Sequence, residues 1–281
     1  MGSEKRIVDL DGAFDKRVAE YFAKKKNKYT EEEWEDAVAE LYKQYGDTKI
    51  ELLGATPNEY YARMTQNELI VALRNRFRKG VPIDGFLRAA AEEKRNRDVL
   101  ILLLDGDNEE ASFALDILGA DQSLYSTYLN LLRRENAEKL RGETVEILQE
   151  DADFICDELL KLYAEGVAKD CVADILSHCL IPRDDVFSIL LDDFLRSEDK
   201  ENAATRLGRY GDERALPYIK ERASFADTGY LAWRAMRVAA EALGGKLPER
   251  DFSHDEEYLV MQREEEKIRE EREKKSSEDK K

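Results

Sequence analysis

From about residue 98 the chain repeats a helical pattern every 28 to 36 residues, and this repeat constrains the fold more than any other feature. Five segments superpose on a leucine near a helix end, with an apolar residue three positions earlier and a small or β-branched residue four positions earlier. The anchoring leucines are Leu118, Leu148, Leu176, Leu207 and Leu243. An amphipathic helix precedes each segment, so each unit is a helix pair that buries its apolar face only by stacking on its neighbours. The sequence therefore predicts an α-solenoid of antiparallel helix pairs.

The first 95 residues carry helix-start signals instead of repeats. Three capping boxes, in which Thr or Ser is followed three residues later by Glu or Gln, stand at Thr30, Thr56 and Thr65. No alternating apolar and polar stretch longer than a few residues occurs, so the predicted fold class is all-α. We expect an N-terminal helical region at 1–95, the repeat region at 96–247, and a charged helix and tail at 248–281.

Residues 207–219, LGRYGDERALPYI, resemble the junction between HEAT-like repeats of the phycobilisome-lyase type, and residues 239–245 are similar to the end of such a repeat. The resemblance covers roughly 98–245, although the other three repeats match only in pattern and lack the Gly-Asp turn. It implies a right-handed, HEAT- or armadillo-like superhelix. It implies no particular activity, because such repeats serve enzymes, adaptors and nucleic-acid binders alike.

Four carboxylates stand two residues before anchoring leucines: Asp116, Glu146, Asp174 and Glu241, with Thr205 at the equivalent position of the remaining repeat. We call the four the acidic stripe. Equivalent positions of a solenoid lie along one face, so the acidic stripe is predicted on the concave side, where it would attract a basic peptide. The alternative is structural, because carboxylates at this position can bridge neighbouring repeats.

The net charge of −17 is confined to residues 98–201, which carry 26 acidic and 9 basic side chains. This balance argues against a nucleic-acid surface over the whole molecule. The basic patch Arg74, Arg76, Arg78 and Lys79, within the basic segment 74–97, is the exception and suits phosphates or an acidic partner. Its alternatives are cations at a helix C-terminus, solvated side chains, or pairing with the acidic middle of the chain.

Metal and catalytic motifs are weak. The segment 105–109, DGDNE, has Glu110 where a calcium loop needs glycine, so we interpret it as a helix–helix turn with a capping Asp or Asn. Cys171, His178 and Cys179 are interpreted as packing residues, because the chain has only two histidines. Nucleophile-elbow, dinucleotide and P-loop motifs do not occur. We therefore assign no catalytic residue, metal or cofactor.

These observations favour a non-enzymatic scaffold that binds a protein or peptide, with a basic segment as the best match for the acidic stripe. The alternatives are a HEAT-type lyase-like enzyme or enzyme accessory and, less favoured, nucleic-acid binding through 74–97. Three cysteines without pairing spacing and a charged N-terminal stretch indicate a cytoplasmic protein with reduced thiols. The longest apolar run, residues 99–104, is too short to cross a membrane, so no membrane partner is expected.

Overall fold

The computed structural model describes residues 8–25 and 30–278, and within these ranges every regular element is helical apart from an isolated bridge between Ile50 and Ala55. The all-α prediction is therefore confirmed. The chain divides into two compact units, residues 1–121 and 122–281, and each is described on its own. The predicted start of the repeat region, at residue 96, lies inside the first unit.

The first unit is built from short helices that begin at strong caps. Thr30, Thr56 and Thr65 each form the predicted capping box, with the Glu three residues later hydrogen-bonded back to the cap. Helix α6 packs on α7, and both contact α4. The elements are α1 (Leu10–Lys24), α2 (Glu31–Gly46), α3 (Pro57–Ala62), α4 (Gln66–Lys79), α5 (Gly85–Glu92), η1 (Lys94–Asn96), α6 (Arg97–Leu104) and α7 (Asn108–Leu118).

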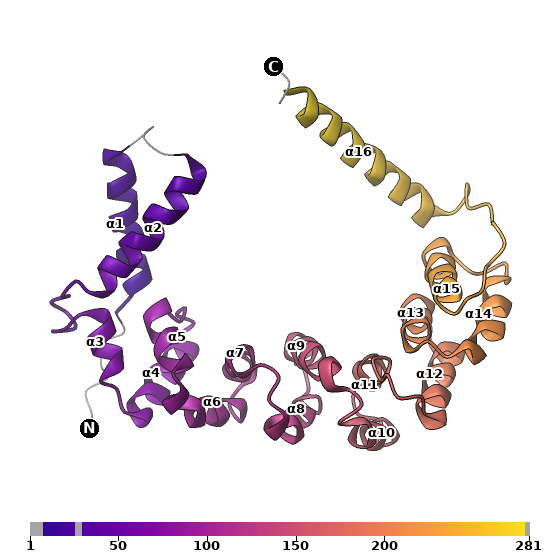
Figure 1. Ribbon diagram of the computed structural model, residues 1–281, viewed down its shortest axis with the longest axis horizontal. Helices are drawn as coiled ribbons and strands as arrows, with labels where there is room; N and C mark the ends of the chain where they lie inside the picture. The colour runs from indigo at the N-terminus through magenta and orange to yellow at the C-terminus, as the bar shows by residue number, and fades with distance from the viewer. Residues whose placement is uncertain (1–7, 26–29, 279–281) are drawn as a thin grey trace. The chain divides into compact units, whose positions relative to one another are not determined.

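The second unit contains four successive helix pairs, followed by the long helix α16 (Figure 1). Its elements are η2 (Gln122–Leu124), α8 (Tyr125–Leu131), α9 (Glu138–Leu148), η3 (Gln149–Asp151), α10 (Cys156–Ala164), α11 (Lys169–Leu176), α12 (Asp184–Arg196), α13 (Lys200–Tyr210), η4 (Glu213–Ala215), α14 (Leu216–Ala223), α15 (Tyr230–Ala242) and α16 (Glu256–Glu278). Helix α16 is capped by the Asp255 carboxylate, which accepts from the backbone N–H groups of Glu257 and Tyr258. Ser253, followed three residues later by Glu256, has the spacing of a capping box in the sequence, but α16 begins at Glu256 and Asp255 caps it.

Each even-numbered helix from α8 to α14 packs on the helix that follows it, and α9, α11, α13 and α15 pack on one another in order. The unit thus has two layers of helices (Figure 1). One layer is formed by α8, α10, α12 and α14, and the other is the row of α9, α11, α13 and α15. Small residues bring α13 and α15 close together: a Cβ at Gly208 would lie 2.7 Å from the Ala239 Cα. This close approach fixes α15, the last helix of the row, against its neighbour.

The anchoring leucines test the repeat register. Leu148, Leu176, Leu207 and Leu243 are buried, as predicted. Leu118 is only half-buried, so that part of the prediction is wrong. On α7 the fully buried leucine is Leu115, one turn earlier. Among the described residues no helix is both long enough and apolar enough to span a membrane.

Candidate functional site

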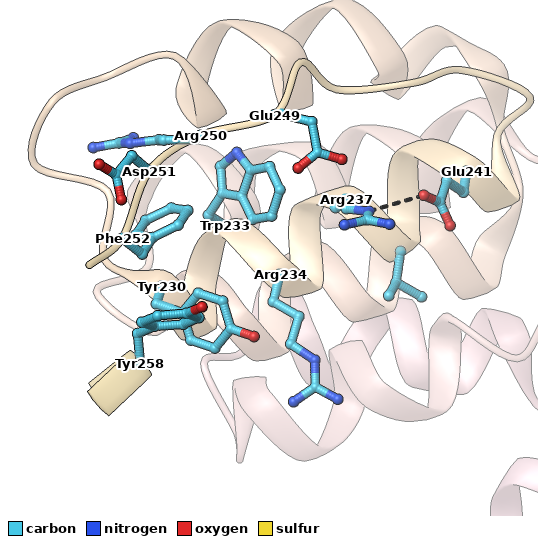
Figure 2. A pocket seen from close by; sticks show the side chains of 11 residues that line it. Tyr230, Trp233, Arg234, Arg237, Glu241, Glu249, Arg250, Asp251, Phe252 and Tyr258 are labelled. Carbon is cyan, nitrogen blue, oxygen red and sulfur yellow. Dashed lines mark hydrogen bonds and ion pairs between the residues drawn. The ribbon is translucent and has the colours of Figure 1, made fainter. Parts of the chain in front are cut away.

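A pocket of about 440 Å³ lies over α15, where the segment 243–255 crosses the helix and leads into α16 (Figure 2). Helix α15 is the last of its row, so no further repeat covers its outer face. The pocket is lined by Tyr230, Trp233, Arg234, Arg237, Val238, Glu241, Glu249, Arg250, Asp251, Phe252 and Tyr258. No histidine or cysteine is among these lining residues, so the site offers binding groups and no conventional nucleophile–base pair.

An aromatic cluster holds the crossing segment on α15. The Phe252 ring centroid lies 5.2 Å from that of Trp233 and 5.3 Å from that of Tyr230, and both Trp233 and Phe252 are buried. The Asp255 carboxylate accepts a hydrogen bond of 3.1 Å from the Tyr230 backbone N–H. Aromatic packing of this kind buries a large apolar area, which keeps the pocket floor in place.

Arg250 also holds the crossing segment in place. Its guanidinium donates to the backbone carbonyls of Phe225 and Ala226, each at 2.8 Å, and to that of Ala223 at 3.3 Å. These carbonyls lie at and just beyond the C-terminus of α14, where a cation is favoured by the helix dipole. Arg250 therefore fastens the crossing segment and has few donors left for a ligand.

Arg237 lines the pocket and also forms an ion pair within α15. Its Nε donates to the Glu241 carboxylate at 3.0 Å, drawn as a dashed line in Figure 2, and this hydrogen bond raises the Arg237 pKa. Its guanidinium carbon lies 5.8 Å from the centroid of the Trp233 ring. Both partners of the ion pair are exposed, so the pair contributes little to stability and yields easily to a competing anion.

Arg234 is the cation that remains available. Its side chain is exposed, and within the described residues its one polar contact is Nη1 to the sulfur of Met261 at 3.6 Å. Because Arg234 precedes Arg237 by three residues, the two lie on neighbouring turns of α15, next to Trp233. The pocket thus combines the exposed Val238, a guanidinium without a carboxylate partner in the described residues and a weakly paired guanidinium.

The acidic stripe is used unevenly. The Asp174 carboxylate, half-buried, accepts from Gln149 Nε2 and Arg209 Nη1, each at 2.9 Å, and so joins the repeats on both sides. Asp116, in the first unit, pairs with Arg88 at 2.7 Å, while Glu241 pairs with Arg237 within its own helix. Of the four, Glu146 is exposed and has no hydrogen bond or ion pair in the described part of the chain. A binding role for the acidic stripe stays a prediction.

The basic patch requires a correction. Arg76 is buried, with its Nη2 2.5 Å from the Asp84 carboxylate, and it is unavailable to phosphates or to a partner. Arg74 pairs with Glu110 at 3.2 Å. Arg78 and Lys79 are exposed at the C-terminal end of α4 and have no ion pair in the described residues. Two cations with no salt-bridge partner, rather than four, therefore remain at this surface.

The segment 105–109 forms the predicted turn, and Asp107 caps α7 by accepting from the backbone N–H groups of Glu109 and Glu110. Among residues 8–25 and 30–278, no group of three or more His, Cys, Asp or Glu side chains is placed to hold a metal ion. Cys179 is buried, as expected of a packing residue, and the neighbouring Cys156 thiol together with burial raises its pKa. Cys171 and His178 are half-buried.

Sequence reasoning missed the α15 pocket and the ion pairs outside the acidic stripe that join the helix pairs. The spacing Trp233, Arg234, Arg237 in the last repeat helix was the available signal for the pocket. Besides the Asp174–Arg209 pair, Asp157 pairs with Arg183 at 2.7 Å and Asp184 with Arg214 at 2.8 Å.

No family model matches the chain, and no curated protein or solved structure is detectably similar to it. The resemblance of residues 207–219 to HEAT-like repeats therefore stays a prediction. The case for a function rests on the chemistry of the site.

Proposed function

We propose that this protein is a non-enzymatic interaction scaffold, built as a right-handed α-solenoid of HEAT-like repeats, that binds a segment of a partner protein. The two layers of the second unit support this proposal, because α9, α11, α13 and α15 follow one another in a row as the second helices of stacked pairs. Stacked helix pairs present extended surfaces suited to peptide segments and partner helices.

The α15 pocket is the binding site that the geometry supports best. The observation that carries this is Arg234, an exposed guanidinium without a carboxylate partner among the described residues, beside Trp233 in a pocket of about 440 Å³. Arginine and tryptophan are the residue types that contribute most at protein interfaces. The matching ligand is a short segment with an aromatic or aliphatic side chain for the exposed Val238 and a carboxylate for Arg234.

Selection of random peptides displayed on phage tests the proposal with the full-length protein as bait. We expect the enriched peptides to place Asp or Glu next to an aromatic residue. Arg234→Glu should weaken a selected peptide by about tenfold or more, because a hydrogen bond to a charged group contributes roughly 1.5–3 kcal/mol and each 1.4 kcal/mol is a factor of ten. Trp233→Ala is a poorer probe, since Trp233 is buried and its loss would loosen the crossing segment.

Arg78→Glu is the matched control, because Arg78 is also an exposed arginine without an ion pair in the described residues, and it lies in the other unit. Binding should be unchanged in this variant. Loss of binding in Arg78→Glu but not in Arg234→Glu would move the site to the basic patch. A selection that enriches no peptide whose binding is weakened by Arg234→Glu would contradict the pocket.

A further inference from the structure

Two neighbouring loops of the second unit expose large apolar side chains to solvent. Phe154, between η3 and α10, is 64% exposed, and Leu180 and Ile181, between α11 and α12, are 87% and 62% exposed. We call these three residues the apolar loop surface. Scattered apolar residues are normal on a protein surface, whereas exposed apolar side chains grouped together are characteristic of interaction sites.

Asp153 joins the two loops. One carboxylate oxygen accepts from the Leu180 backbone N–H at 3.0 Å, and the other accepts from the Ile181 backbone N–H at 3.1 Å. The carboxylate thereby satisfies both backbone donors and fixes the positions of the two exposed side chains. Pro182 follows directly and keeps Ile181 out of the helical conformation.

The far end of the α11–α12 loop is also fixed. The Tyr210 hydroxyl, from α13, accepts from the Arg183 backbone N–H at 2.8 Å and donates to the Arg183 carbonyl at 3.0 Å. At the near end, Cys156 at the start of α10 and Cys179, the residue before Leu180, are both buried, and each thiol shifts the pKa of the other. The apolar loop surface is therefore presented by a backbone with little freedom, and its exposure is a stable feature of the fold.

The charges around these loops are negative. Glu150, Asp157, Glu158 and Asp184 are exposed on the adjoining segments. Two cations here are already balanced, because Arg183 pairs with Asp157 at 2.7 Å and with Asp185 at 2.8 Å, and Arg214 pairs with Asp184 at 2.8 Å. Glu150 and Glu158 have no ion pair in the described residues. The segment also lies in the part of the chain, residues 98–201, where acidic side chains outnumber basic ones by 26 to 9.

We infer that the apolar loop surface binds an amphipathic helix of a partner protein, whose apolar side chains contact Phe154, Leu180 and Ile181 and whose Lys and Arg residues face the surrounding carboxylates. Apolar contact supplies the affinity, and the complementary charge selects the partner and speeds association. This surface is separate from the α15 pocket, and its expected ligand is basic instead of acidic. The two proposals can therefore be tested independently.

The test uses the full-length protein and two fluorescent helical peptides of about 18 residues, long enough for five turns. One is composed of leucine and lysine with an amphipathic pattern, and in the other every lysine is replaced by glutamate. We expect the leucine–lysine peptide to bind at about 50 mM salt and to weaken several-fold at about 300 mM, because screening shortens the range of the surrounding charges. The leucine–glutamate peptide should bind at least about tenfold more weakly.

The double variant Leu180→Ser, Ile181→Ser should lose at least about tenfold in affinity for the leucine–lysine peptide. The matched control is Leu195→Ser, an equally apolar exposed residue on α12 within the same acidic region. The control should change the affinity less than about twofold. Glu150→Lys with Glu158→Lys should weaken binding and reduce its salt dependence, since neither carboxylate has a partner in the described part of the chain.

Circular dichroism should give the same melting temperature for each variant. If the double variant melts early, Phe154→Ser provides the independent test. Equal loss in Leu195→Ser, equal binding of both peptides, or unchanged binding in the double variant would overturn the inference. A dimer in sedimentation experiments that the double variant abolishes would also overturn it, because the occupant would then be a second copy of the chain.

Discussion

Arg76 and Asp84 form an ion pair in the interior of the first unit, and the Tyr61 hydroxyl donates to the same carboxylate at 2.9 Å. Asp84 also caps α5 by accepting from the Leu87 backbone N–H. Burial, together with the adjacent Asp84 charge, raises the pKa of the Tyr61 hydroxyl, so it stays a hydrogen-bond donor at neutral pH. Single residues that look like surface charge in the sequence thus organise the interior.

Replacing Asp84 with Asn removes one charge of the pair and leaves the Arg76 guanidinium buried without its counterion. We expect the free energy of unfolding, measured by urea denaturation, to fall by about 3–5 kcal/mol. Arg63→Ala, which removes an exposed pair with Glu59, is the control and should cost no more than about 1 kcal/mol. Similar small losses in both variants would show that the buried pair is not required.

His178 should titrate below its ordinary value. Burial lowers its pKa from 6.5, and the nearby Arg209 charge lowers it further. The unfolded chain therefore binds a proton more readily than the folded one, so this contribution to stability is present above pH 6.5 and is lost as the pH falls through 6.5 toward the lower folded value. NMR titration should show a histidine resonance that shifts below pH 6.5 and disappears in His178→Gln. A midpoint above 6.5 would contradict the prediction.

At the scale of helices, turns and ion pairs connect one pair to the next. Gly211 ends α13 with φ of 79°, a conformation that favours glycine, and Arg214 after it reaches back to Asp184 at 2.8 Å. Arg183 reaches Asp157 in the same way from the preceding turn. Neighbouring helix pairs are thus joined by specific polar contacts as well as by buried leucines.

Asp174 and Glu146 occupy equivalent positions in successive repeats but differ in their partners, which makes them a matched comparison. Asp174→Asn should cost about 1.5–3 kcal/mol, because it weakens the charged hydrogen bonds from Gln149 and Arg209. Glu146→Gln should change stability by less than about 0.5 kcal/mol. The comparison is made by urea denaturation, and equal effects would mean that Asp174 does not hold the repeats together.

Leu148 and Leu176 are fully buried, one in each of two successive repeats. Truncation to alanine should cost about 2–5 kcal/mol in each case, through lost burial and the cavity left behind. The exposed Leu195 on α12 gives the control, since Leu195→Ala removes the same atoms from the surface. Unchanged melting temperatures for Leu148→Ala and Leu176→Ala would show that the repeat register is wrong.

At the scale of the molecule, the net charge is unevenly distributed along the chain. The acidic excess lies entirely in residues 98–201, whereas residues 1–97 are nearly balanced. Within the first unit, burial of Arg76 and pairing of Arg74 reduce the basic patch to Arg78 and Lys79. The middle segment therefore attracts cationic partners, whereas the basic patch offers few free cations for phosphates.

We accordingly expect no tight binding to duplex DNA. At physiological salt, fluorescence anisotropy should give a dissociation constant weaker than about 1 µM, since affinity for nucleic acid depends on the number of phosphates neutralised. An acidic polymer such as heparin should likewise bind weakly. Sub-micromolar, salt-sensitive DNA binding would contradict the scaffold proposal and restore the basic segment 74–97 as a nucleic-acid site.

The helix starts and the repeat could be predicted from the sequence because they depend on short-range chemistry. Thr30 and Glu33 bond to each other's backbone within one turn, and buried leucines recur at the spacing of a helix pair, so both signals are local. Two details of the sequence prediction were wrong because a suitable residue stands nearby in each case. Leu115, not Leu118, is the fully buried leucine of α7, and Asp255, not Ser253, caps α16.

Only the tertiary structure decided which charges are available. Arg76 and Arg78 are two residues apart in one basic run, yet Arg76 is buried against Asp84 and Arg78 is exposed. Asp174 and Glu146 share a repeat position, but only Asp174 meets cations from another helix. The α15 pocket and the apolar loop surface likewise arise where segments far apart in the chain meet, as at Asp153 and Leu180. Sequence patterns reflect interactions within one helix, whereas the exposure and pairing of its side chains depend on which elements pack beside it.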